Sequence, residues 1–194
     1  MTFRTLVFAA AVAAATVAAP AANAAIFTVN ALSNSSSGGT GLASLSVNAG
    51  SRYTVSASLT DLWSAGALPR WSNANGLTGN TFATGTDESG EPAGTLIGAD
   101  FGLHSQAGLS APFGSLVGEI GGVYQLLGAS FNGPAWGTGT LNLYYWDSNN
   151  GDNFGTIDVN VSAVPEPQTW VMLVAGFGLV GVSVRRRRVA RVAA

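Results

Sequence analysis

Oxygen-bearing side chains are concentrated in one short segment of the chain, residues 146–155. Its donors are Asp147, Asn149, Asn150, Asp152 and Asn153. Calcium takes about six to eight oxygen ligands from carboxylates, amide carbonyls and backbone carbonyls. A short loop that contains Gly151 can fold such groups inward, so the segment predicts a calcium site. A solvated turn is the alternative, because Asn, Asp and Gly are also the usual turn residues.

Aromatic residues form a second set of candidates: Trp63, Trp71, Trp136, Tyr144, Tyr145 and Trp146. Aromatic faces stack on sugar rings, but aromatic side chains also fill the cores of β-sandwiches. Trp63 and Trp71 lie near Pro69 and residues typical of loops, so we take these two as candidate sugar contacts. For most of the set, packing in the core is the simpler interpretation.

The residues needed for catalysis are scarce. The chain contains one histidine, His104, and no cysteine, which excludes a three-His zinc site, a thiolate zinc site and a disulfide scaffold. A Ser-His-Asp triad would lack the G-x-S-x-G motif that presents the serine in α/β-hydrolases. Asp87, Glu88 and Glu91 lie in a Gly/Ser-rich stretch with no framework to hold two carboxylates at a glycosidase spacing. The sequence therefore predicts a protein that is not an enzyme, with a hydrolase as the rejected alternative.

Charge is both rare and segregated. Only 9% of the 194 residues are charged, and the net charge is −2. Between residues 25 and 164, nine acidic residues face only Arg52 and Arg70, a balance of −7, and the other six arginines lie at the two ends. A segment this acidic does not suit a polyphosphate backbone, so we expect no nucleic-acid partner.

The middle of the chain has the pattern of an all-β domain. Short apolar runs are separated by Gly, Ser, Asn and Thr; the clearest are residues 26–32, 52–59, 116–120, 123–127, 140–146 and 156–161. Seven or eight strands in about 140 residues favour a β-sandwich or jelly roll.

Individual runs carry more specific predictions. Tyr53, Val55, Ala57 and Leu59 alternate onto one face, and Ile157, Val159 and Val161 do the same in the last run. Gly121-Gly122 predicts a hairpin between two strands. We also expect residues 140–146 to pair with residues 156–161. Residues 73–92 have weak periodicity and are predicted to form a long loop.

The N-terminal residues 1–24 have the pattern of a secretory signal peptide. Arg4 supplies the positive charge, residues 6–19 are apolar, and Ala22-Asn23-Ala24 is an A-x-A cleavage site. We expect signal peptidase to cleave here and leave a mature start at Ala25. An uncleaved membrane anchor is the alternative.

The C-terminal end combines three features in order. Pro165-Glu166-Pro167 comes first, then an uncharged stretch of 17 residues at about 168–184 that contains Trp170, then Arg185, Arg186, Arg187 and Arg188. That length is the short limit for a transmembrane helix, Trp170 suits the membrane interface, and arginines are retained on the cytoplasmic side. We predict a single transmembrane helix and an Arg-rich cytoplasmic tail at 185–194. A buried core helix with a basic tail is the alternative.

The order of these three features resembles the PEP-CTERM sorting signal of Gram-negative bacteria, also catalogued as an ice-binding protein C-terminal domain, over residues 163–188. The resemblance implies recognition by an exosortase, which cleaves near Pro165-Glu166-Pro167 after a transient stage in the inner membrane. The product then resides at the envelope surface or outside the cell, often with exopolysaccharide. The two prolines keep the backbone extended and accessible to a protease.

A second resemblance spans most of residues 25–162. Residues 114–121 read G-x-L-x-x-x-I-G, residues 141–147 end on Asp147, and Asp152-Asn153-Phe154-Gly155 leads into the last strand. This order is similar to that of the PA-IL-like lectins, the galactose-binding-like calcium lectin family. The resemblance implies a jelly-roll β-sandwich in which calcium is bridged to two sugar hydroxyls.

Carried over residue by residue, the resemblance assigns Asp147, Asp152 and Asn153 as side-chain calcium ligands. Asn150 would supply a loop carbonyl, and Ala65 or Gly66 a backbone carbonyl. Trp146 replaces the family's usual Asn, and residues 75–92 diverge from its sugar-contacting loop. The resulting hypothesis is calcium-dependent carbohydrate binding at the cell surface or in the matrix. The alternative is a structural surface protein with this fold that binds no sugar.

Overall fold

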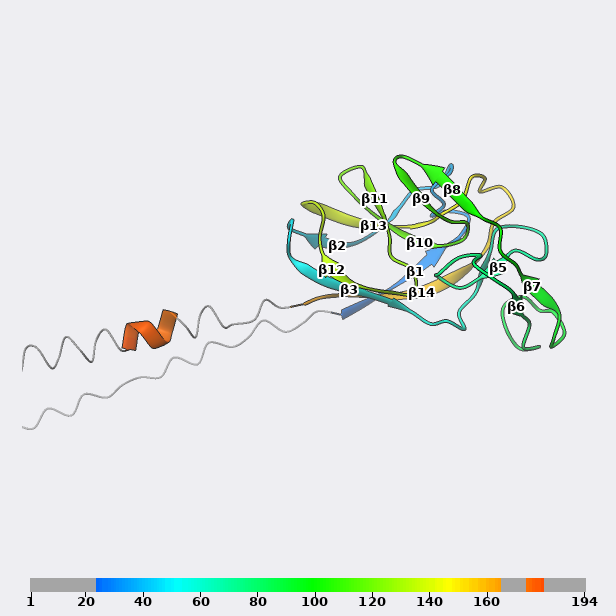
Figure 1. The fold of residues 1–194 in the computed structure, drawn as a ribbon, viewed down its shortest axis with the longest axis horizontal. Coiled ribbons are helices and arrows are strands. Elements are labelled where there is room, and N and C mark those ends of the chain that lie inside the picture. Colours follow the sequence, from blue (N-terminus) through cyan, green and yellow to red (C-terminus); the bar gives the residue numbers. More distant parts are fainter. Residues whose placement is uncertain (1–23, 165–173, 180–194) are drawn as a thin grey trace, which may run out of the picture. The chain divides into compact units, whose positions relative to one another are not determined.

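The computed structural model describes residues 24–164 and 174–179. Within residues 24–164 the chain forms fourteen strands (Figure 1). Their bounds are β1 Ala24–Asn30, β2 Leu42–Val47, β3 Arg52–Ala57, β4 Trp63–Ser64, β5 Trp71–Ser72, β6 Thr81–Phe82, β7 Leu96–Gly98, β8 Leu103–Gln106, β9 Leu109–Pro112, β10 Leu116–Ile120, β11 Val123–Leu126, β12 Ser130–Pro134, β13 Gly139–Tyr145 and β14 Phe154–Ala163.

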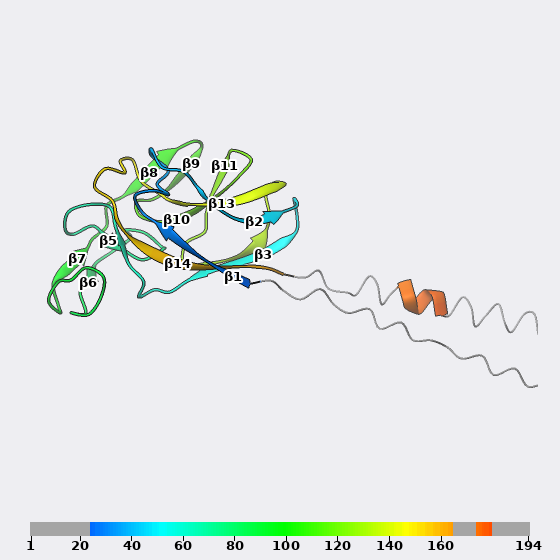
Figure 2. The same ribbon diagram turned by 180° about the vertical axis from the view of Figure 1, so that it is seen from behind.

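The strands form two main antiparallel sheets. One has the order β12-β3-β14-β4-β5, with β1 also paired to β14, and the other has the order β11-β10-β13-β2. Figures 1 and 2 show the two sheets stacked face to face. Their inner faces share one core, in which Val55 and Ile157 of the first sheet are buried with Leu116 and Leu141 of the second. The all-β prediction is confirmed.

The residue pattern explains which side chains face this core. In β14, Ile157, Val159 and Val161 are buried and the residues between them are exposed, as the alternation predicts. In β3, Tyr53 and Val55 are buried in the same way. Leu59 does not continue that face, because β3 ends at Ala57 and Leu59 is exposed.

The double glycine forms the hairpin turn that its sequence predicts. Ile120 at the end of β10 is paired with Val123 at the start of β11. Gly121 and Gly122 have φ values of +62° and +86°. A two-residue turn with two positive φ values matches the twist of the flanking strands, and glycine adopts it without strain.

The pairing expected between the last two long strands is wrong. β13 pairs with β10 and β2, whereas β14 pairs with β1, β3 and β4 in the other sheet. The physical reason is the connection: residues 146–153 are too many for a tight hairpin turn, and they cross from one sheet to the other. The predicted calcium loop is therefore the crossover between the sheets.

Residues 73–92 are mainly irregular, as predicted, but they are not free of strands. β6 lies inside this stretch and pairs with β7, in the part of the fold that Figure 1 shows beside β5. Asp87 organises the loop that follows β6 by accepting hydrogen bonds from Thr84 and Ser89.

The two ends of the sandwich lie side by side. Ala24 at the start of β1 pairs with Ser162 near the end of β14, so the first and the last strand of the described domain meet at one end of the same sheet. Several predicted residues lie outside the described part of the chain: Ala22, Pro165–Trp170 and Arg185–Arg188.

Residues 174–179 are helical. Among the described segments, no helix has the length and apolar character needed to cross a membrane, and most of the predicted span at 168–184 falls outside them.

Candidate metal centre

The crossover loop is fixed to the connection between β1 and β2. The Asp147 backbone N–H donates to Ser36 Oγ at 3.0 Å, and that hydroxyl donates to the Asp147 carbonyl at 2.9 Å. Ser37 Oγ donates to the Ser148 carbonyl at 2.7 Å. Just before the loop, the buried indole of Trp146 donates to the His104 carbonyl at 2.9 Å. These bonds hold the start of the loop in one position.

Asp147 is a buried carboxylate, with only 4% of the residue exposed. Its Oδ1 accepts a hydrogen bond from the Ser148 backbone N–H at 2.7 Å. Burial raises the pKa of Asp147, the negative charge of Asp152 adds to the rise, and hydrogen bonds from Ser148 and Asn153 partly offset it. The folded protein thus holds two mutually repelling carboxylates near each other, an arrangement that a bound cation would stabilise.

Asn153, the residue after Asp152, carries a buried oxygen that accepts no hydrogen bond within the described residues. The residue is 6% exposed, and its Nδ2 donates to the Ala31 carbonyl at 3.1 Å, which fixes the orientation of the amide. Within the described residues, its buried Oδ1 accepts no hydrogen bond. Buried polar atoms are nearly always paired. A buried amide oxygen without a hydrogen bond, in the same loop as two carboxylates, is available to a hard cation.

Asp152 closes the site from the side of the β4–β5 connection. Its Oδ1 accepts from Asn149 Nδ2 at 3.0 Å, and its Oδ2 lies 3.7 Å from Arg70 Nη1. Gly66 lies directly against the same carboxylate, since a Cβ atom at Gly66 would overlap Asp152 Oδ2. The structure therefore brings Asp152 and the Gly66 segment together across a gap of more than eighty residues.

The predicted backbone ligands have partners already. The Gly66 carbonyl accepts from Ser64 Oγ at 2.7 Å, and the Ala65 carbonyl accepts from Arg70 Nη1 at 3.4 Å. The Asn150 carbonyl accepts from the Asn153 backbone N–H at 3.2 Å. A carbonyl oxygen has two lone pairs, so each retains one for a cation.

The side chain of Asn150 packs against Gly38. Among the described residues, no group of three or more His, Cys, Asp or Glu side chains is placed to hold a metal. The candidate centre is therefore a mixed one, made of two carboxylates, one amide and backbone carbonyls. This donor chemistry suits calcium better than a softer metal.

The structure does not present Trp63 and Trp71 as sugar contacts. Trp63 is fully buried, and its ring packs edge-on against Tyr145 with centroids 4.6 Å apart. Trp71 is 8% exposed. Burial leaves neither indole ring a free face for a sugar, contrary to the expectation. Two exposed aromatic side chains lie nearby: Phe154, 65% exposed and packed edge-on against Trp71, and Phe101, 45% exposed and packed against Arg70.

A hollow of about 500 Å³ adjoins Asn153. It is lined by Asn30, Leu32, Glu88, Asn153, Phe154, Gly155 and Thr156. Polar side chains, a carboxylate and an exposed aromatic ring meet there, as they do in pockets that bind small molecules.

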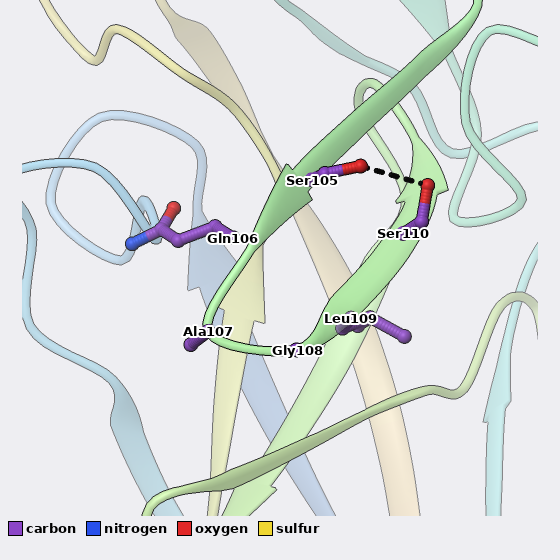
Figure 3. A pocket seen from close by; sticks show the side chains of 6 residues that line it. All are labelled: Ser105, Gln106, Ala107, Gly108, Leu109 and Ser110. Atoms are coloured by element: carbon purple, nitrogen blue, oxygen red, sulfur yellow. Dashed lines mark hydrogen bonds between the residues drawn. The ribbon is translucent and has the colours of Figure 1, made fainter.

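A second hollow, of about 310 Å³, lies at the β8–β9 turn and is lined by residues 105–110 (Figure 3). Ser105 donates to Ser110 across it at 2.9 Å, while Gln106 points away from that pair and donates to the Ser36 carbonyl at 3.0 Å. Its lining has no ionisable side chain. The turn therefore supports Ser36, which in turn fixes Asp147.

His104 has a structural environment. Its Nε2 lies 3.1 Å from Gln106 Oε1, and its ring packs against Phe113 and Trp146.

Two residues near the candidate centre, Ser36 and Arg70, were not predicted from the sequence. Arg70 carries a signal in hindsight, because it is one of two cations between residues 25 and 164. Ser36 carries none, since it lies in an ordinary Ser/Gly stretch.

Comparisons with known proteins identify the C-terminal segment and give a remote likeness for the sandwich. No curated protein matches the chain. One similar solved structure is the EclA N-terminal domain, described as a PllA-like lectin, with 22% sequence identity and a TM-score of 0.44. The match covers 72% of this chain and 95% of that one. Residues 163–188 match the family model of the PEP-CTERM protein-sorting motif, so the chain carries this sorting motif directly after its β-sandwich.

Proposed function

We propose that this chain is an exported surface or matrix protein whose β-sandwich binds carbohydrate through calcium. The PEP-CTERM motif implies exosortase processing and export to the cell envelope or outside. The calcium-dependent part of the proposal rests on the donor cluster and on the sequence order that resembles the PA-IL-like lectins. The same resemblance is the ground for proposing a jelly-roll arrangement of the strands.

The observation that carries the proposal is the unpaired Oδ1 of Asn153. This atom is buried and its amide is oriented by the Ala31 carbonyl, and the residue directly follows Asp152 and donates a hydrogen bond that lowers the pKa of Asp147. A merely solvated turn would not bury an acceptor without a donor, because that costs about 1–3 kcal/mol. A calcium ion held by this oxygen would offset the cost.

Each residue has a separate task in this arrangement. Asp147 and Asp152 supply the negative charge that balances the cation, and Asn153 supplies a neutral oxygen at a fixed angle. When bound, calcium supplies open coordination positions for two neighbouring hydroxyls of a sugar. The exposed ring of Phe154 lies next in the chain and offers an apolar face to the sugar's C–H groups.

The position of the loop suits a binding role at a surface. β14 begins after the loop and ends at Ala163, where the sorting motif starts. Its ten residues span roughly 30 Å at the usual rise per strand residue. The candidate loop therefore adjoins the first residue of β14, and the matched motif begins at its last residue. Attachment through the C-terminal segment would leave the site free to bind.

We further propose that signal peptidase removes residues 1–24 and that residues 168–184 form the transient transmembrane helix held by Arg185–Arg188. Before processing, the sandwich would face away from the cytoplasm. Processing near Pro165-Glu166-Pro167 would then separate the sandwich from its anchor.

Glycan-array binding of the purified chain with calcium and with a chelator tests the function. We expect retention of at least one glycan in calcium and its loss on chelation. Thermal unfolding measured in parallel shows whether calcium binds at all. Calcium-dependent stabilisation with no glycan retained would support the structural alternative, in which the cation only rigidifies the crossover between the two sheets. No calcium effect on either measurement would overturn the proposal.

A further inference from the structure

Arg70 is held in place beside the donor cluster. Its guanidinium lies over the ring of Phe101, 4.5 Å from the centroid, and Nη1 donates to the Ala65 carbonyl at 3.4 Å. The same nitrogen lies 3.7 Å from Asp152 Oδ2, and 36% of the side chain is exposed. An arginine fixed by an aromatic ring and a carbonyl is preorganised, with one side open to solvent.

Positive charge at this place is unusual for the domain. Between residues 25 and 164 the only other cation is Arg52. Arg52 lies at the start of β3, where its Nη2 donates to Asn132 Oδ1 at 2.9 Å and its carbonyl accepts from Val164. Arg52 therefore sits near the sorting end, and Arg70 is the cation that adjoins the donor cluster.

Calcium would change the partner of Arg70. Arg70 Nη1 is close to two oxygens of the proposed calcium set, the Ala65 carbonyl and Asp152 Oδ2. A calcium ion on Asp147 and Asp152 would balance both carboxylates, which leaves the charge of Arg70 without a counterion. Two neighbouring cations that face solvent attract an anion, and a guanidinium binds a carboxylate through two parallel hydrogen bonds.

From this geometry we propose that the site takes an acidic saccharide, a uronic acid, with Arg70 as the residue that selects its carboxylate. Hydroxyl oxygens of the sugar ring would occupy the open positions of the cation while the carboxylate pairs with Arg70. The inference rests on the proposed calcium-dependent binding and adds the class of sugar. In a domain whose balance is −7, Arg70 supplies the positive charge beside the donor cluster.

Glu88 is the charge that opposes this assignment. It lines the neighbouring hollow together with Asn153 and Phe154. A carboxylate there would repel an anionic group placed in the hollow, so the sugar carboxylate belongs on the Arg70 side and the neutral face of the sugar on the Phe154 side. Glu88 thereby fixes the orientation in which an acidic sugar binds, and removing its charge should not weaken that binding.

The test compares matched sugars on the purified full chain. Titration calorimetry in calcium measures the affinities for methyl galacturonoside, its neutral methyl ester and methyl galactoside, and for the corresponding glucose and mannose series. We expect at least one uronate to bind about tenfold more tightly than its neutral ester, the scale of one added charged hydrogen-bonded pair. Raising the salt concentration should narrow this difference, because the attraction is electrostatic.

Variants separate the role of Arg70 from a general effect on the fold. Arg70→Gln should lower the affinity for the uronate more than the affinity for its neutral ester, so that the ratio of the two affinities approaches one. It should also strengthen calcium binding, because a cation next to Asp152 is removed. Arg70→Lys should retain part of the preference, since it keeps the charge and loses the two-pronged geometry. Arg52→Gln is the matched control and should behave like the unmodified chain.

The outcomes distinguish this inference from the proposed function. If neutral sugars bind in a calcium-dependent way and no uronate binds more tightly than its ester, the acidic-sugar inference is wrong and the proposed function stands. If no sugar binds in calcium, both fail. Because the comparison of uronate with ester uses the unmodified chain, a variant that does not fold leaves the test intact.

Discussion

Gly66 packs against the carboxylate of Asp152, so closely that a Cβ atom at position 66 would overlap Asp152 Oδ2. Gly66 also has a φ of +118°, which side chains rarely tolerate. Gly66→Ala should therefore displace Asp152 and weaken calcium binding at least tenfold, with about 1–2 kcal/mol lost from the free energy of unfolding. Calcium titration followed by calorimetry measures the first effect, and chemical denaturation measures the second.

The control for this variant is Gly50→Ala. Gly50 has a φ of +83° and no neighbour within 4 Å of an added Cβ. It carries a similar backbone cost without the overlap, so it should destabilise the fold and leave calcium affinity unchanged. Equal calcium affinity in Gly66→Ala and Gly50→Ala would show that Asp152 is not a ligand.

Asp147→Asn should have opposite effects on the calcium-free and the calcium-bound protein. Burial raises the pKa of Asp147, so its charge destabilises the calcium-free fold at pH values above that raised pKa. The amide keeps an acceptor for Ser148 and removes the charge, which should stabilise the calcium-free protein by about 1 kcal/mol. The stabilisation by calcium, about 2.7 kcal/mol at a hundred times the dissociation constant, should be lost.

Melting curves in chelator and in excess calcium check both signs for Asp147→Asn. Asp158→Asn is the control, because Asp158 lies exposed on β14 outside the loop. A lower melting temperature of Asp147→Asn in chelator would contradict the argument that this carboxylate is held at a cost.

The parts of the sandwich that depend on neighbouring residues in the chain were predictable from the sequence. β14 alternates buried and exposed residues, and the Gly121-Gly122 turn requires only the two residues that form it. The partner of β13 was not predictable, because the crossover at residues 146–153 has no local signal for which sheet follows. Strand pairing at long range depends on the whole core and not on the connecting loop.

The candidate site divides in the same way. Asp147, Asp152 and Asn153 lie within seven residues of each other, so their types and spacing were visible in the sequence. Arg70 and Ser36 reach the site only through the fold, by way of the β4–β5 and β1–β2 connections. Trp63 and Trp71 were wrongly predicted to contact a sugar. Tryptophan side chains are common both in sugar sites and in buried cores, and these two are buried.

Asp87 should make the protein sensitive to acid. Hydrogen bonds from Ser89 and Thr84 lower the pKa of Asp87 to about 2. A carboxyl group whose pKa is lower in the folded state stabilises the fold above its unfolded pKa of about 3.9, and this contribution disappears as the pH falls toward 2. Asp87→Ala should therefore lower the melting temperature at pH 7, and its difference from the unmodified chain should shrink between pH 4 and pH 2. A difference that stays constant with pH would assign the effect to packing.

Replacing Pro165-Glu166-Pro167 with three alanines should leave the chain unprocessed in the membrane fraction. This segment lies within the matched sorting motif. Its two prolines hold the backbone extended and remove N–H donors, which keeps the segment open to a protease, whereas alanines favour a helix that would continue toward residues 168–184. Immunoblots of membrane and released fractions measure the outcome. Three alanines at Gly90-Glu91-Pro92, an irregular stretch within the sandwich domain, provide the control and should be processed normally. Release of the sorting-motif variant at the normal rate would show that processing does not read Pro165-Glu166-Pro167.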